Sequence, residues 1–115
     1  MEIKHDSTGE LDVVRLKGRL DLAGAGVAEE FFTKFRKAVT TETALVVNFR
    51  ELHYISSSGL RVLLAAFKDL QGKGGHMVLC EMNVAVEEVF RFAGLDAVFR
   101  IYPTEREATE SFAAK

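Results

Sequence analysis

Residues 44–81 carry the pattern that decides the fold, and they read ALVVNFRELHYISSSGLRVLLAAFKDLQGKGGHMVLCE. The first six, from Ala44 to Phe49, are almost all apolar and β-branched in the middle, which predicts a central strand covered on both faces. Apolar residues then recur at helical spacing until GKGG at 72–75 ends the helix: Leu60, Leu63, Leu64, Phe67 and Leu70. Residues 76–81 predict a second strand, and the strand–helix–strand unit places the two strands in parallel.

Two more strands are predicted before this unit, at 1–5 and 11–18, and they form an antiparallel hairpin. In the second of them Val14 and Leu16 point to one face and Val13 to the other, the alternation of a half-exposed strand. A first helix follows, with apolar residues at helical spacing: Val27, Phe31, Phe35 and Val39. Phe32 falls off this stripe, so we expect it to be partly exposed.

The C-terminal third continues the alternation of helices and strands. Asn83 is a candidate N-cap for a helix that carries Val86, Val89, Phe90 and Ala93, and Gly94 is a candidate C-cap. Phe92 lies off the apolar stripe of this helix and is expected to be partly exposed. Residues 97–102 predict a last strand, and Thr104 with Glu107 forms a capping-box pattern that begins a closing helix.

The elements together predict an α/β fold with a mixed, mostly parallel sheet of about five strands and about four helices. The 115 residues are 48% hydrophobic and 28% charged, and they contain neither an internal repeat nor a linker. Such a composition is typical of a chain that folds throughout. We therefore expect a single domain over residues 1–115.

Charge and hydropathy exclude several classes of function. The formal net charge is −2, and no stretch gathers basic residues with aromatic ones, so nucleic acid is not an expected partner. The N-terminal stretch lacks the pattern of a secretory leader, and no apolar run is long enough to cross a membrane. We expect a cytoplasmic protein without direct membrane insertion.

The sequence predicts neither a disulfide nor a metal site, and it indicates no cofactor. Cys80 is the only cysteine and lies in an apolar strand, which favours a buried, inert thiol. His5, His53 and His76 are far apart and lack the spacing of metal ligands. They are expected to be structural or exposed.

Three catalytic patterns are incomplete in this sequence, because each is missing a required residue. Ile55 stands where a nucleophile elbow around Ser57 would need glycine. GKGG at 72–75 lacks the spacing and the hydroxyl residue of a phosphate-binding loop. The central strand ends in Asn48 and Phe49 without the acidic residues that a receiver-type phosphorylation site needs to bind Mg²⁺. The sequence therefore predicts a protein that is not an enzyme.

The segment YISSSGLR at 54–61 is the most informative, because its serines lie where the central strand leads into a helix. The first turn of a helix has unpaired N–H groups and a partial positive charge, so Ser56, Ser57 or Ser58 could cap it. A phosphate on a serine there would be held favourably and would add about −1.5 to −2 charge. Such a serine could serve as a switch for the docking of a partner.

This segment resembles the signature of STAS domains and of the bacterial anti-sigma factor antagonists among them, an aromatic–hydrophobic pair followed by Asp or Ser and then Ser-Ser/Ala-Gly-Leu. Residues 54–60 match it in order. The resemblance extends to GRLD at 18–21, VVNF at 46–49 and FRFAGLDAVF at 90–99, and so covers nearly the whole chain. Many members have Asp where this chain has Ser56.

The resemblance implies a signalling role in transcription regulation. The unphosphorylated protein would bind an anti-sigma factor that is also a serine kinase of the GHKL type, and this binding would free a sigma factor. Phosphorylation of Ser57 would end the binding, and a PP2C-type phosphatase would reset the protein. Ser56 and Ser58 remain alternative acceptors. A second possibility is a STAS subunit of a membrane transporter or larger assembly, in which Ser57 only packs or docks.

Several residues around Ser57 are predicted to contact the partner. Asp21 ends the GRLD sequence in a loop that should open at the same end of the sheet, although it could equally be a capping residue. Arg61 and Val62 lie off the buried stripe of the helix. The predicted contacts are Asp21, Ser56, Ser58, Gly59, Arg61 and Val62. We expect a Gly59→Val substitution to weaken binding more than folding, because a β-branched residue would crowd the first turn.

Overall fold

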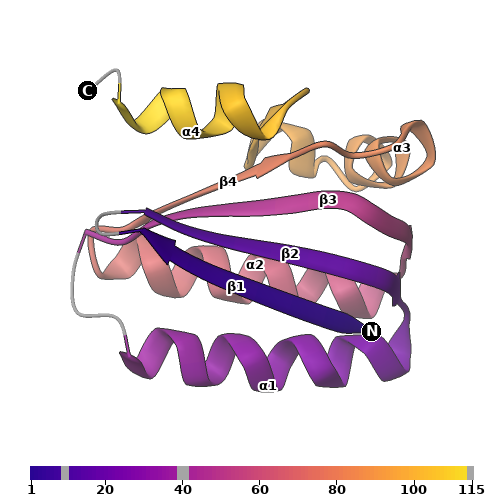
Figure 1. The fold of residues 1–115 in the computed structure, drawn as a ribbon. Helices are drawn as coiled ribbons and strands as arrows, with labels where there is room; N and C mark the ends of the chain where they lie inside the picture. The colour runs from indigo at the N-terminus through magenta and orange to yellow at the C-terminus, as the bar shows by residue number, and fades with distance from the viewer. Residues whose placement is uncertain (9–10, 39–41, 114–115) are drawn as a thin grey trace.

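The computed structural model describes residues 1–8, 11–38 and 42–113 and shows a five-stranded sheet with helices on both faces (Figure 1). The strands are β1 (Glu2–Thr8), β2 (Leu11–Leu20), β3 (Ala44–Ile55), β4 (His76–Cys80) and β5 (Arg100–Tyr102). The helices are α1 (Leu22–Ala38), α2 (Ser57–Gly72), α3 (Val84–Phe92) and α4 (Glu105–Ala113), with a short 3₁₀ turn at Leu95–Ala97. The predicted α/β fold is confirmed.

The strands lie in the sheet in the same order as in the chain. β1 pairs with β2 in antiparallel orientation, and the pairs β2–β3, β3–β4 and β4–β5 are parallel. β3 is therefore central, as predicted, but it continues beyond Phe49 to Ile55. Pairing with β2 explains the extension, because Leu20 and Ile55 are still in register at the ends of the two strands.

Two hydrophobic cores lie on opposite faces of the sheet. In Figure 1, α1 and α2 cover one face and α4 lies across the other. The larger core takes side chains from the sheet, α1, α2 and α3, and Phe49, Leu63 and Phe90 at its centre are fully buried. The smaller core lies under α4 and consists of Val13, Val46, Val78, Cys80 and Ala108.

The smaller core corrects one expectation about β2. Val14 and Leu16 face the larger core, as the alternation predicts. Val13, on the other face, is also buried, because α4 packs over it. The strand is therefore covered on both faces for part of its length rather than half exposed.

The buried stripe of α1 also differs from the predicted one. Phe35 is buried as expected, but Val27 is 46% exposed and Phe31 only half-buried, whereas Phe32 is 5% exposed. Val39 lies outside the described residues. The full buried set of this helix is Gly24, Ala25, Ala28, Phe32 and Phe35. Three of these five residues are small and let α1 pack closely. The stripe predicted from large apolar residues alone was therefore rotated around the helix relative to the observed one.

The C-terminal third largely follows the prediction. The side chain of Asn83 accepts a hydrogen bond from the Val86 N–H at 2.8 Å, and that of Thr104 accepts one from the Glu107 N–H at 3.1 Å, so both cap their helices. Gly94 has the positive φ of 74° expected of a C-cap. The last strand is shorter than predicted, because the chain forms the 3₁₀ turn before β5 begins at Arg100.

The Cys80 thiol is fully buried, as predicted, and burial raises its pKa to about 12. Since only the thiolate is an efficient nucleophile, we expect iodoacetamide to leave folded Cys80 unmodified at mildly alkaline pH and to alkylate it in denaturing urea. Intact-mass spectrometry checks both results. Equal rates of alkylation in the two conditions would contradict the buried position.

Among the described residues, no group of three or more His, Cys, Asp or Glu side chains is placed to hold a metal ion. In the same part of the chain, none of the helices combines the length and apolar character needed to cross a bilayer.

Candidate partner-binding site

The carboxyl ends of β2 and β3 lie side by side and bring two distant segments together. The Ser56 N–H donates a hydrogen bond of 2.9 Å to the Leu20 carbonyl oxygen. The loop at Asp21 and the first turn of α2 therefore share one edge of the sheet, as the sequence predicted. We call the exposed surface formed by Arg19, Asp21, Leu22, Tyr54, Ser57, Ser58 and Arg61 the switch edge.

Ser56 is the serine that caps α2. Its Oγ accepts a hydrogen bond from the Gly59 N–H at 3.3 Å and donates one to the Leu20 carbonyl oxygen at 3.1 Å. An ionised aspartate at this position could accept the first bond but could not donate the second. Serine here therefore ties α2 to β2, which gives the departure from the common Asp a physical reason.

The two following serines are placed differently. Ser57 is the first residue of α2 and is exposed, and its hydroxyl makes no hydrogen bond within the described part of the chain. Ser58 is half-buried, and its Oγ accepts a hydrogen bond of 3.4 Å from an Arg61 Nη atom. Of the three hydroxyl groups, that of Ser57 is the most accessible to another protein.

Gly59 is buried against Leu20 rather than presented to a partner. A Cβ atom added to Gly59 would lie 2.6 Å from Leu20 Cγ and 2.9 Å from the Leu20 carbonyl oxygen. Both distances are shorter than van der Waals contact allows. The geometry thus favours the opposite of the expected order for Gly59→Val, with a larger effect on folding than on binding, and it assigns Gly59 a packing role.

Asp21 caps α1 and stays partly exposed. Its Oδ1 accepts a hydrogen bond of 2.9 Å from the Gly24 N–H, and this bond, together with the charge of Arg19, lowers the pKa of the carboxyl group. A lowered folded-state pKa means that the stabilisation is present at neutral pH and is lost as the pH falls through that pKa. The capping alternative is therefore realised, and Asp21 can contact a partner only with its remaining exposed atoms.

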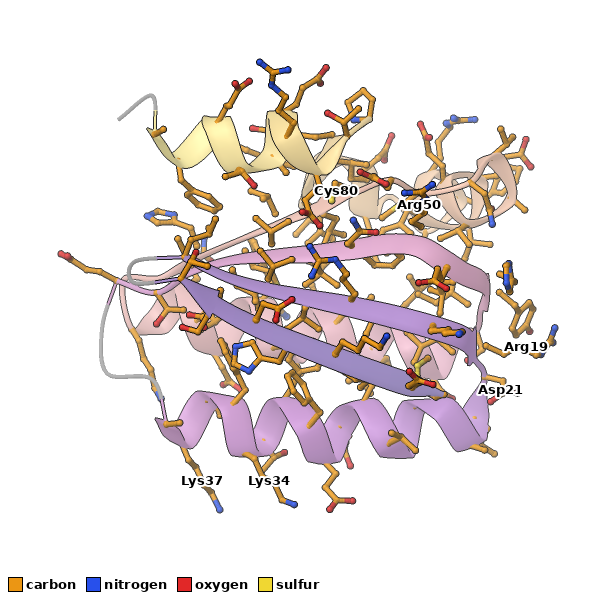
Figure 2. All side chains as sticks on the ribbon, in the orientation of Figure 1. Arg19, Asp21, Lys34, Lys37, Arg50 and Cys80 are labelled. Atoms are coloured by element: carbon orange, nitrogen blue, oxygen red, sulfur yellow. The ribbon has the colours of Figure 1, made fainter. Side chains whose placement is uncertain are left out.

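Three residues of the switch edge were not among the partner contacts predicted from the sequence: Arg19, Leu22 and Tyr54. The guanidinium carbon of Arg19 lies 4.3 Å from the centroid of the Tyr54 ring, a cation–π contact between paired positions of β2 and β3. Figure 2 shows Arg19 and Asp21 at the same end of the molecule. Leu22, the first residue of α1, is 78% exposed. The register of two parallel strands is not visible in a single sequence, so Arg19 and Tyr54 could not be paired from it.

A groove of about 630 Å³ runs between α1 and α2 and begins at the switch edge. Ser58, Arg61 and Val62 line it from α2, and Leu22 and Ala25 are among the residues that line it from α1. Val62 is half-buried in this groove, so it faces α1 more than the outward side that the helical pattern suggested. The groove also includes Arg36 and Asp69, which form an ion pair with each other.

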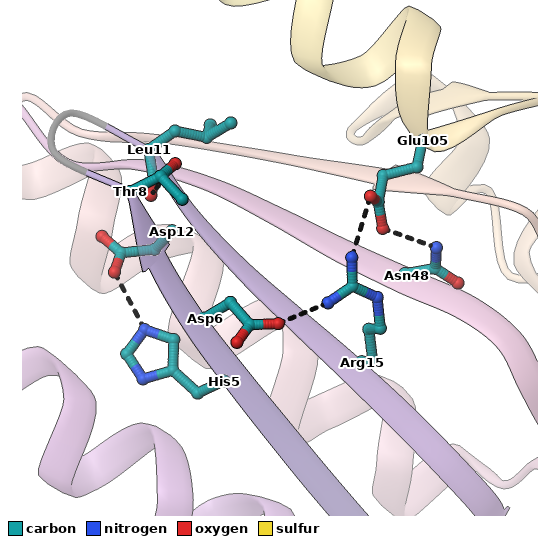
Figure 3. Close-up of polar contacts among 8 residues, drawn as sticks. All are labelled: His5, Asp6, Thr8, Leu11, Asp12, Arg15, Asn48 and Glu105. Carbon is teal, nitrogen blue, oxygen red and sulfur yellow. Dashed lines mark hydrogen bonds and ion pairs between the residues drawn. The ribbon is translucent and has the colours of Figure 1, made fainter.

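A polar cluster on the opposite face of the sheet holds α4 in place (Figure 3). Arg15 donates hydrogen bonds to Asp6 at 2.7 Å and to Glu105 at 2.9 Å, and Asn48 donates one to the second Glu105 oxygen at 2.9 Å. Glu81 accepts a hydrogen bond from the Glu105 N–H at 2.8 Å. These groups satisfy one another, so the cluster serves to dock α4 beside the smaller core.

The chain is similar to known proteins over nearly its whole length. The model of the STAS domain family matches residues 3–108. The protein BtrV of Bordetella bronchiseptica, provisionally named an anti-sigma factor antagonist, is 32% identical over 113 residues, which are 97% of this chain and 95% of BtrV.

Solved structures of the Bacillus anti-sigma factor antagonist SpoIIAA are similar as well. Its unphosphorylated form superimposes with a TM-score of 0.79 at 27% identity, covering 99% of this chain and 98% of SpoIIAA. The phosphorylated form gives a TM-score of 0.72 at 27% identity over 96% of this chain and 99% of SpoIIAA.

A transporter shares the fold. The murine anion transporter Slc26a9 superimposes with a TM-score of 0.82 at 11% identity, over 96% of this chain and 19% of the transporter. At that level of identity the likeness shows the fold alone.

Proposed function

Because this chain belongs to the STAS domain family, we propose that it is an anti-sigma factor antagonist that binds its anti-sigma factor through the switch edge. The observation that carries the proposal is the division of labour among the serines: Ser56 caps the helix, while the hydroxyl of Ser57 stays exposed beside it. BtrV and SpoIIAA support it as relatives of nearly equal length.

The partner in this proposal is an anti-sigma factor of the GHKL kinase type, which binds the unphosphorylated protein. The kinase transfers the γ-phosphoryl group of ATP to Ser57 Oγ, the hydroxyl proton is lost and ADP leaves. A PP2C-type phosphatase hydrolyses the phosphoserine and restores binding. The family resemblance of residues 54–60 supports this cycle, and the SpoIIAA structure in a phosphorylated form supports it for a relative.

Phosphorylation can end binding without unfolding the domain. Ser57 is exposed in the first turn of α2, where a phosphate has room and favourable N–H groups. A group with about −1.5 to −2 charge would then stand in a surface that previously offered a neutral hydroxyl. A partner that excludes water from that hydroxyl would meet an anion that it cannot solvate.

The remaining predicted contacts frame Ser57. Arg61 and the exposed atoms of Asp21 would supply charged contacts, and Ser58 and Val62 would be reached at the opening of the groove. Ser56 and Gly59 would act through the shape of the turn, since both are engaged with Leu20. The proposal is one of regulation by binding, with no catalytic role for this chain.

We expect a bait of the wild-type protein or of Ser57→Ala to retain a GHKL-type kinase from host lysate, and Ser57→Asp to lose it. With purified kinase, calorimetry should show an affinity loss of about tenfold or more for Ser57→Asp, because a charge at the interface is costly to bury. Ser7→Asp, which places the same charge on the exposed strand β1, is the matched control and should bind like the wild type.

Equal retention of the kinase by all baits would contradict the switch. Equal retention of transporter subunits by all baits would instead support the alternative, in which this chain is a non-switching STAS subunit of a membrane transporter. The anion transporter Slc26a9 contains a segment with the same fold.

A further inference from the structure

Arg61 is the cation nearest to Ser57 along α2, and no carboxylate in residues 1–8, 11–38 and 42–113 forms an ion pair with it. It follows Ser57 by four residues, so the two side chains project from the same face of the helix. Its only hydrogen bond in the described part of the chain is the 3.4 Å contact with Ser58 Oγ, a long bond to a neutral acceptor. Arg61 is also exposed, so its guanidinium group can move without disturbing the core.

The other charged groups around the groove are already paired or lie on other elements. Arg36 and Asp69 form an ion pair, and Arg19 is engaged with Asp21 and with the Tyr54 ring. Glu29 of α1 lines the groove with Arg61, but no ion pair joins the two. Arg61 is therefore the available cation beside Ser57 within the described residues.

We propose that Arg61 binds the phosphoryl group of phosphorylated Ser57 and thereby adds a second element to the switch. The proposal rests on the proposed function for the identity of the phosphorylated residue. When Ser57 carries phosphate, Arg61 leaves Ser58 Oγ and forms charge-assisted hydrogen bonds with the phosphate oxygens. The switch edge thus gains an anion and loses its free cation in a single event.

The helix geometry favours this pair. An acidic group four residues N-terminal to a basic one is the better of the two possible orders, because it also agrees with the helix dipole. Guanidinium and phosphate match each other in planar, two-point hydrogen bonding. The Gly59 N–H is occupied by Ser56, so the phosphate draws on Arg61 and on the other N–H groups of the first turn.

The test measures the second pKa of the phosphoserine by ³¹P NMR in protein that carries phosphoserine incorporated at position 57 during translation. A bound guanidinium stabilises the dianion and lowers that pKa. We expect Arg61→Gln to raise it by about 0.3 pH unit or more, the size expected for a helical ion pair. Arg61→Lys, which keeps the charge but not the planar group, should raise it less.

The control is Arg106→Gln, which removes the same charge from α4 on the opposite face of the sheet. A pKa that is the same in the wild type and in Arg61→Gln overturns the proposal. So does an equal rise in Arg61→Gln and Arg106→Gln, because that result reflects net charge alone. Because Arg61 is exposed, its substitution should leave the fold intact. A thermal unfolding curve for each variant checks that the variant is folded.

This experiment stands apart from the test of the proposed function. The phosphoserine is installed without any kinase, so the measured pKa does not depend on which partner binds. A failed kinase pull-down with a positive NMR result would remove the proposed function and leave the Arg61 pair. The reverse pattern would remove the pair and leave the switch at Ser57.

Discussion

Gly59→Val is expected to lower the free energy of unfolding by about 3 kcal/mol, because it overpacks the junction between β2 and α2. A Cβ at this position would already lie 2.6 Å from Leu20 Cγ and 2.9 Å from the Leu20 carbonyl oxygen. That carbonyl also accepts the hydrogen bonds from Ser56, so it cannot move away without losing them. Two methyl groups on the Cβ would add to the crowding.

Urea denaturation followed by circular dichroism measures the change. Gly72→Val is the matched control, since Gly72 ends the same helix and a Cβ there would meet nothing within 4 Å. The control should cost less than about 1 kcal/mol, because an exposed helix end tolerates the side chain. Equal stability of the Gly59→Val variant and the wild type would show that Gly59 is not packed against Leu20.

Phe90→Ala is expected to destabilise the domain by about 3–5 kcal/mol, the usual cost of removing a buried phenylalanine ring. Phe90 is fully buried and joins α3 to the larger core. Its ring contacts Phe49 with a centroid distance of 5.9 Å and Phe99 with one of 5.8 Å, both in edge-to-face geometry. A cavity in this position would leave both rings without a partner on one side.

Phe92→Ala removes the same side chain two residues further along α3 and serves as the control. Phe92 is 89% exposed, so we expect a change within about 0.5 kcal/mol. Thermal or urea unfolding of the two variants measures the difference directly. Similar losses in both would contradict the orientation of α3, since its two faces would then be buried to the same degree.

Local patterns in the sequence predicted most of the fold. The apolar run at 44–49, the helical stripe that follows it and the glycines at 72–75 indicated the central βαβ unit, which the structure confirms. Asn83 and Gly94 marked the ends of a helix because their roles depend on their own hydrogen bonding and backbone conformation. The exposure of Phe92 and the burial of Cys80 were also correct.

Predictions failed where burial depends on a neighbour from another part of the chain. Val13 is buried by α4, which begins about ninety positions later. Phe32 is buried because alanines at 25 and 28 bring that side of α1 close to the core. Large apolar residues dominate a periodicity search, so small residues on a buried face rotate the apparent stripe.

The sequence predicted where the candidate site lies, but it did not determine the role of each residue in that site. Sequence alone determined that three serines and a glycine stand at a strand-to-helix junction, because strand and helix signals are local. Only the tertiary structure decided that Ser56 is the cap, that Ser57 is exposed and that Gly59 is packed. Ser56 and Gly59 both contact Leu20, which lies 36 positions before Ser56. Hydrogen bonding and packing across that separation exist only after β2 and β3 have paired.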